Sequence, residues 1–188
     1  NCRLEETGDS DSRTSTSGEE YPIKSDVEYL YAADEDAGSD IGNGKEFTIG
    51  EQSTMDVHHD YAFVQANIND SKKVEFDDPN SLISEQRREI KSNRVFPVEL
   101  VCTNPDGTAG VDVSTTVQQG KDTAPISVNV GSKCKITEGE TTTARGITLQ
   151  KAISVNGSDV NDGVADFSVN STDDVDIVLT NTYKRRTT

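Results

Sequence analysis

The sequence predicts an all-β protein built as an antiparallel sandwich of two sheets, and three observations support this fold class. Apolar side chains alternate with other residues in short runs, which is the period of half-buried strands. Turn-forming sequences separate these runs, and Asn104-Pro105-Asp106-Gly107 is the clearest of them. Seven or so runs recur at intervals of about 10 to 15 residues, a spacing typical of antiparallel sandwiches.

The alternating runs place the expected strands in order along the chain. The first strand is expected over residues 62–68. Each later strand carries its apolar residues at alternate positions, so these residues share one face. The faces are Phe96, Val98, Leu100 and Cys102; Val111, Val113, Thr115 and Val117; Ile126, Val128 and Val130; Cys134, Ile136 and Glu138; Ile147 and Leu149; Phe167 and Val169; and Val175, Ile177, Leu179, Asn181 and Tyr183.

Residues 79–94 are the one segment with a helical pattern. Leu82, Ile83 and Ile90 would give it a thin apolar face, and Asn80 or Ser81 would cap its N-terminus. We expect a short helix or a structured insertion here.

An internal repeat divides the chain. Three segments recur in the same order: Cys2-Arg3-Leu4-Glu5-Glu6 resembles Cys134-Lys135-Ile136-Thr137-Glu138, residues 38–44 resemble 157–163, and residues 47–57 resemble 167–177. We therefore expect residues 1–63 to be the C-terminal half of one repeat, residues 64–184 to be a complete repeat and residues 185–188 to be linker. The first copy has extra residues at 7–20, whose Ser, Thr, Gly and acidic composition predicts a long loop.

Composition limits the function classes. The 188 residues carry a net charge of −16, and 31% are hydrophobic. Nucleic-acid binding needs a basic surface, so we expect none. No apolar run is long enough to span a membrane and no signal peptide is recognisable, so we expect no membrane insertion. The chain does not begin with methionine and is expected to be a segment of a longer protein.

Cysteine spacing suggests a covalent staple. Cys102 and Cys134 occupy equivalent inward positions on two expected strands. A disulfide between them would close a loop of roughly 33 residues and contribute about 3–4 kcal/mol, which matters for so thin a core. The alternative is two free buried thiols, as in a cytosolic protein. That pairing leaves no cysteine in the sequence for Cys2, which is either an unpaired thiol or the partner of a cysteine in another chain.

Two polar residues are expected inside the sandwich. The alternation places Glu138 beside Cys134 and Ile136, and it places Asn181 inward on the last strand. Burying a carboxylate is costly unless the group is hydrogen-bonded or neutral. A hydrogen-bonded polar pair in the core is the simplest interpretation.

These residues carry a family resemblance. An inward Glu on a middle strand and an Asn in Leu179-Thr180-Asn181-Thr182-Tyr183 resemble the collagen-binding-protein B-type (CnaB-like) domains of Gram-positive surface proteins. The paired cysteines and the Cys134–Glu138 run are similar to the disulfide-bearing immunoglobulin-like repeats found in tandem in actinobacterial wall-anchored proteins. The resemblance covers residues 95–184 well and 1–63 partly, and it implies an immunoglobulin-like (prealbumin/CnaB-like) sandwich.

In CnaB-like domains, a Lys on the first strand joins that Asn in an isopeptide bond, with the Glu as proton shuttle. The first strand expected here contains no Lys. Lys72 and Lys73 are predicted to lie later, in a turn, and Tyr61 stands where the first copy would need the Asn. We therefore expect the disulfide, and not an isopeptide bond, to staple this protein.

No cofactor, metal or catalytic constellation is expected. His58 and His59 are adjacent on one strand, so their rings would point to opposite faces. Asp34, Asp36 and Asp40 place carboxylates at alternate positions, as calcium loops do, but no Glu follows at the twelfth position. Nothing assembles a nucleophile, a base and an oxyanion site, so we expect no enzyme.

The expected function is structural: a stalk or spacer repeat of an extracellular, cell-surface or wall protein, with neighbouring repeats of the same protein as partners. One alternative is an adhesive module that binds a glycan or a host protein. The other is a filament subunit whose half repeat is completed by an identical subunit through strand addition.

Overall fold

The structure is a computed structural model, and it describes residues 1–5, 12–32, 39–40, 42–49, 54–78, 80, 82–143, 145–160 and 162–186. The chain forms two compact units. The N-terminal unit comprises Asn1–Thr14 and Gly18–Val64, and the C-terminal unit comprises Ser15–Ser17 and Gln65–Thr188. Most described residues lie in strands, as the sequence predicted.

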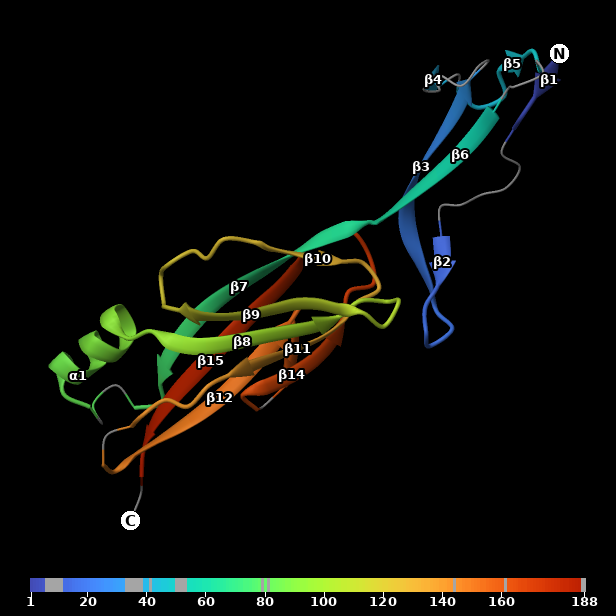
Figure 1. Ribbon diagram of the computed structural model, residues 1–188. Helices are drawn as coiled ribbons and strands as arrows, with labels where there is room; N and C mark the ends of the chain where they lie inside the picture. The colour runs from blue at the N-terminus through green and yellow to red at the C-terminus, as the bar shows by residue number, and fades with distance from the viewer. Residues whose placement is uncertain are drawn as a thin grey trace. The chain divides into compact units, whose positions relative to one another are not determined.

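The C-terminal unit is a two-sheet sandwich (Figure 1). Its first sheet has the order β10-β7-β15-β12-β13, and its second has the order β14-β11-β8-β9. Every pair is antiparallel except β7 and β15, which run parallel. The strands are β7 (Gln65–Phe76), β8 (Phe96–Thr103), β9 (Ala109–Val117), β10 (Ile126–Asn129), β11 (Lys133–Glu138), β12 (Ile147–Val155), β13 (Ser158–Val160), β14 (Val164–Ser168) and β15 (Val175–Arg185).

Alternation along these strands builds the core between the two sheets. On β8 and β15, buried and less buried residues alternate along the strand, as period-2 patterning requires. The fully buried side chains include Ile68, Phe96, Ile136, Ile153, Ile177, Leu179 and Tyr183. The predicted inward faces of β8, β11 and β15 are thus observed, whereas β9 is an edge strand with only Val117 buried.

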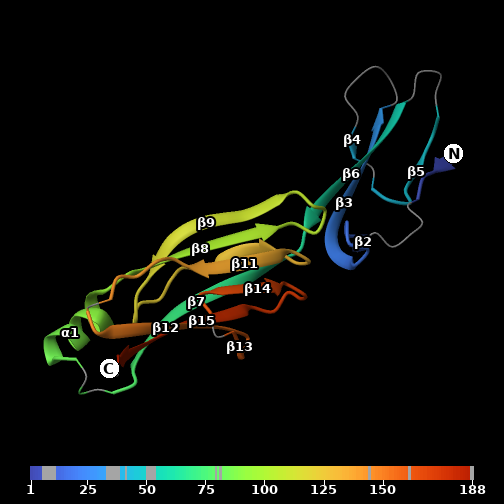
Figure 2. The same cartoon turned by 90° about the horizontal axis from the view of Figure 1, so that it is seen from below.

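The predicted helix is present but shorter than residues 79–94. It consists of α1 (Ser84–Arg88) followed by a π-helical turn, η1 (Glu89–Asn93). The N-cap residue is Ile83, where we had expected Asn80 or Ser81, and the Ile83 N–H donates to the side chain of Gln86. Leu82 and Ile90 are buried, but Ile83 is exposed. Figure 2 shows α1 at the end of the sandwich where β8 begins.

The N-terminal unit has fewer strands. β1 (Cys2–Arg3) pairs with β5 (Glu46–Phe47), and β3 (Glu20–Ala32) pairs with β2 (Ser12–Thr14), β4 (Ser39–Asp40) and β6 (Thr54–Phe63). Tyr21 and Ile23 are its buried apolar residues among those described. The boundary at Val64 means that the strand expected over residues 62–68 is in fact the junction of β6 and β7. Within the described part of the chain, no helix is long and apolar enough to cross a bilayer.

Candidate functional site

Three polar side chains from three strands meet inside the C-terminal unit. Lys72 lies on β7 and Asn181 on β15, and the parallel ladder places Lys72 opposite Leu179 and Asn181 opposite Val74. Glu138 is the last residue of β11 in the facing sheet. The strand period turns all three side chains inward, so the two sheets bring them together from opposite sides.

Glu138 binds both of the other residues. Lys72 Nζ donates to Glu138 Oε2 at 2.7 Å, and Asn181 Nδ2 donates to Glu138 Oε1 at 2.6 Å. The side chains of Lys72 and Glu138 are 0% exposed, and Asn181 is also 0% exposed. One carboxyl group therefore holds an amine and an amide in a dry interior, where charge is expensive to maintain.

Burial changes the acid–base behaviour of Lys72. Loss of solvent lowers the pKa of the ammonium from 10.5 to about 8, against the raising effect of the Glu138 hydrogen bond and charge. The nearby Lys151 charge lowers the pKa further. The Lys72 Nζ atom also lies 4.3 Å from the centre of the Phe96 ring. A lysine in this setting loses its proton readily, and a neutral amine is a nucleophile.

Lys151 supports the strand end that carries Glu138. Its Nζ atom donates to the backbone carbonyls of Gly139 at 2.6 Å and of Glu138 at 3.3 Å. Lys151 is also the register partner of Asn181 on the neighbouring strand. A side chain at Gly163 would place its Cβ 3.0 Å from the Lys151 side chain, so this glycine leaves room for the lysine to reach the carbonyls.

The Asn181 amide has one unsatisfied atom. Its Oδ1 is buried and accepts no hydrogen bond from the described residues. The oxygen and nitrogen of an amide are assigned from the hydrogen-bond network. Rotating the amide by half a turn would place Oδ1 on Glu138, which could then donate to it if the carboxyl carries a proton. That orientation would polarise the Asn181 carbonyl and make its carbon open to attack by an amine.

The prediction that Lys72 lies in a turn is wrong. β7 continues to Phe76, well past the expected strand end at Ile68, and Lys72 is buried within it. The polar run Asn67-Ile68-Asn69-Asp70-Ser71-Lys72-Lys73 concealed this strand because its inward positions include Asp70 and Lys72. Parity with Ala66, Ile68 and Val74 was the signal that could have placed Lys72 inward.

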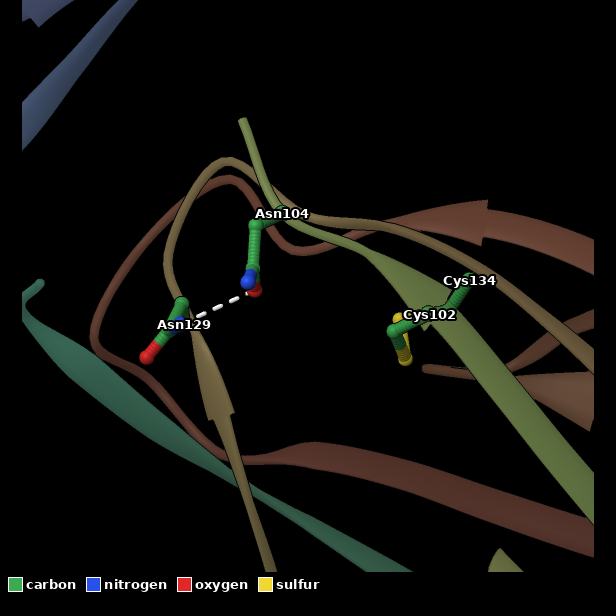
Figure 3. The surroundings of a disulfide bond; sticks show 4 residues. All are labelled: Cys102, Asn104, Asn129 and Cys134. Carbon is green, nitrogen blue, oxygen red and sulfur yellow. Dashed lines mark hydrogen bonds between the residues drawn. A yellow bond between two sulfur atoms is a disulfide. The ribbon is translucent and has the colours of Figure 1, made fainter. Parts of the chain in front are cut away.

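A disulfide bond lies near this site. Cys102 on β8 and Cys134 on β11 face each other across the antiparallel ladder, with a Cα–Cα distance of 4.0 Å and an S–S distance of 2.08 Å. Both are buried. Figure 3 shows the bond beside a side-chain hydrogen bond in which Asn129 donates to Asn104 at 2.9 Å. Because β11 carries both Cys134 and Glu138, one strand connects the disulfide to the polar site.

The other residues singled out from the sequence do not join this site. Cys2 is an exposed free thiol on β1. Asp34 and Asp36 lie outside the described residues, and for Asp40 only the backbone, in β4, is described. His58 is exposed on β6. Tyr61 is exposed too, with the Arg13 guanidinium 4.0 Å from its ring centre. In the described parts of the chain, no three His, Cys, Asp or Glu side chains group as metal ligands would.

Comparison with known proteins identifies a family model, described as "Domain of unknown function (DUF5979)", that matches residues 71–184. No curated protein matches the chain.

Comparison with solved structures returned several matches. The major pilin protein (T3.2) from Streptococcus pyogenes is 13% identical, with 94% of this chain and 64% of that chain covered and a TM-score of 0.37. A bacterial adhesin from Mobiluncus mulieris containing intramolecular disulfide, isopeptide and ester bond cross-links is 14% identical, with 86% and 60% covered and a TM-score of 0.41. The present chain spans less than two thirds of the length of either protein, and we argue function from its own residues alone.

Proposed function

Because the chain belongs to the family described as "Domain of unknown function (DUF5979)", whose name assigns no activity, we propose a function from the chain's own residues. We propose that it is a structural segment, a stalk or spacer, of a cell-surface protein. Its C-terminal unit is locked by two internal covalent bonds. One is the disulfide between Cys102 and Cys134, and the other is an amide bond between Lys72 and Asn181.

A single observation carries the second bond: Glu138 hydrogen-bonds Lys72 with one carboxyl oxygen and Asn181 with the other, with all three side chains buried. If Lys72 and Glu138 had no chemical role, a buried ammonium and carboxylate would contribute little net stability to so small a core. A hydrophobic trio of similar volume is often as stable or more stable. The arrangement is therefore better explained by chemistry than by packing.

The proposed reaction proceeds within this trio. The Lys72 ammonium passes a proton along its hydrogen bond to Glu138, which leaves a neutral amine and a carboxylic acid. The amine attacks the Asn181 Cγ atom while the acid donates a hydrogen bond to Oδ1. A new Nζ–Cγ bond forms, and Nζ gives up one proton through Glu138 to Nδ2. The Cγ–Nδ2 bond breaks and Nδ2 leaves as ammonia, while Glu138 keeps the proton that it took from the ammonium. The reaction occurs once per molecule and turns over no substrate.

Two internal cross-links suit a protein that must persist outside the cell. Disulfides form and last in oxidising compartments, which favours an extracellular location. A core this thin gains from covalent closure, because each bond restricts the unfolded chain. The charge of −16 keeps the surface hydrated and the protein soluble.

Intact mass under reducing and denaturing conditions tests the proposal. The wild-type chain should be lighter than its calculated mass by about 17 Da, the mass of one ammonia. Fragmentation should yield a branched peptide that joins Lys72 to Asn181. The variants Lys72→Met, Glu138→Ala and Asn181→Ala should each have the full calculated mass.

A neighbouring lysine supplies the matched control. Lys73→Met removes the exposed lysine next to Lys72 and should retain the mass loss. Each variant should also be measured without reductant, because formation of the Cys102–Cys134 disulfide reports that the sandwich has folded. A wild-type chain that folds, forms this disulfide and keeps its ammonia would contradict the amide bond.

A further inference from the structure

The N-terminal unit repeats the strand pairing of the second half of the C-terminal unit. Cys2 on β1 pairs with Phe47 on β5, and Cys134 on β11 pairs with Phe167 on β14. β3 pairs with β4 and β6, just as β12 pairs with β13 and β15. The sequence repeat thus coincides with a repeat of antiparallel ladders.

The equivalent positions differ sharply in exposure. Ile136 is 1% exposed and its counterpart Leu4 is 39% exposed; Val169 is 1% and Ile49 is 62%; Ile177 is 1% and Val57 is 40%. Cys134 is buried in its disulfide and Cys2 is an exposed thiol. The N-terminal unit therefore presents, as surface, the residue positions that form core in the C-terminal unit.

The C-terminal unit also shows which strand stands beside the first of these positions in the same sheet. β8 lies against β11, with Cys102 opposite Cys134 and Leu100 opposite Ile136. In the described part of the N-terminal unit, β1 pairs with β5 alone. By equivalence, a strand antiparallel to β1 would place an apolar residue opposite Leu4 and a cysteine opposite Cys2.

We propose that the edge of β1 opposite β5, beside the exposed Leu4, is an acceptor for a β8-like strand from polypeptide outside residues 1–188, whose cysteine forms a disulfide with Cys2. The occupant is defined by its chemistry: an extended segment with apolar residues at alternate positions and a cysteine at the end of that pattern. Main-chain hydrogen bonds to β1 set its register, and one of its apolar residues packs beside Leu4 on the same face of the sheet. This proposal does not depend on the Lys72–Asn181 bond.

The experiment uses the whole chain and a peptide with the sequence of residues 95–104, whose cysteine is a mixed disulfide with glutathione. The Cys2 thiolate attacks the peptide sulfur, a protein–peptide disulfide forms, and glutathione leaves as its thiolate, so no net oxidation is needed. The control peptide replaces the residues at positions 96, 98 and 100 with Asn and keeps the cysteine. Intact mass follows both adducts with time.

We expect the protein to couple to the β8-sequence peptide about tenfold faster than to the control peptide. Leu4→Asp should remove this preference and leave Cys2 as reactive as before towards the control, and Cys2→Ser should form no adduct. Hydrogen exchange should show protection of the β1 amides only in the adduct with the β8 sequence. Equal rates for the two peptides, or a Cys2–Cys2 dimer that forms in preference to either adduct, would overturn the proposal.

Discussion

The two units use the same pattern of strands in opposite ways. In the C-terminal unit, β11, β12, β14 and β15 share two facing sheets with β7, β8, β9 and β10, and the apolar positions between the sheets form a core. In the N-terminal unit, three equivalent positions are exposed: Leu4 after β1, Ile49 after β5 and Val57 on β6. Alternation in a sequence therefore specifies which residues share a face, and their burial depends on the strands and sheets that pack around them.

The largest expected difference between the units comes from Glu138. Glu138→Leu would leave the Lys72 ammonium buried without its partner and prevent the proposed amide bond, so the C-terminal unit should lose about 3–5 kcal/mol of unfolding free energy. Denaturant titration followed by hydrogen exchange would separate the two units. The exposed Glu99→Leu on β8 is the control and should change little. Equal loss in both variants would mean that the buried trio is not a stabilising feature.

Replacing the cysteines should give the next largest difference in stability between the two units. Replacing Cys102 and Cys134 together with Ala should cost the C-terminal unit about 3–4 kcal/mol, since the bond closes a long loop. Cys2→Ala, at the equivalent position of the N-terminal unit, should leave stability unchanged in the isolated chain. Thermal unfolding under identical buffer conditions measures both. A clear loss on replacing Cys2 would show that this thiol already has a structural role within residues 1–188.

Replacing Lys151 tests whether this residue positions Glu138 for amide-bond formation. Lys151→Met should slow amide-bond formation about tenfold, equivalent to about 1.4 kcal/mol of activation free energy. The backbone carbonyls of Glu138 and Gly139 lose their hydrogen-bond donor, and Lys72 loses a nearby positive charge that lowers the pKa of its ammonium. Lys151→Arg should recover most of the rate. The measurement is the time course of mass loss after refolding. A conserved rate in Lys151→Met would limit this residue to packing.

Shortening an apolar side chain should lower the stability of the C-terminal unit more than shortening its counterpart lowers the stability of the N-terminal unit. Ile177→Val in the core should cost about 0.5–1.5 kcal/mol. Val57→Ala at the matching exposed position should change stability by less than about 0.5 kcal/mol. Denaturant midpoints at constant m-value would compare them. If Val57→Ala were as costly as the core change, its face would already be covered in solution.

The stability of the C-terminal unit should also depend on pH through Lys72. In Asn181→Ala the Lys72 amine stays free, and Asn181 is not among the causes of its altered pKa. The folded-state pKa of about 8 lies below the ordinary value of 10.5, so the unfolded chain binds more protons between these values. The C-terminal unit should therefore gain stability as the pH rises from 8 to 10.5. Lys72→Met/Asn181→Ala should lack this gain; an identical gain there would assign it to another group.

The sequence predicted the parts of the fold whose apolar alternation is uninterrupted. β8, β11 and β15 were placed with the correct inward faces, and Glu138 and Asn181 are buried on β11 and β15. Period-2 patterning is informative there because burial alone selects the residues.

Prediction failed where polar residues occupy inward positions of a strand. β7 was cut short because its inward positions include Asp70 and Lys72, which read as turn residues when only hydrophobicity is considered. The sequence repeat led to the expectation of a half repeat over residues 1–63, but the exposure of Leu4, Ile49 and Val57 could be measured only in the structure.

The parallel contact between β7 and β15 has a mechanical consequence. These are the first and last strands of the C-terminal unit, so tension applied through Gln65 and Arg185 pulls two neighbouring strands past each other. The hydrogen bonds between the two strands are then loaded in shear, so they must break together and not one after another. A bond from Lys72 to Asn181 would carry the load directly between the two strands, and everything from residue 73 to residue 180 would remain folded and unstretched.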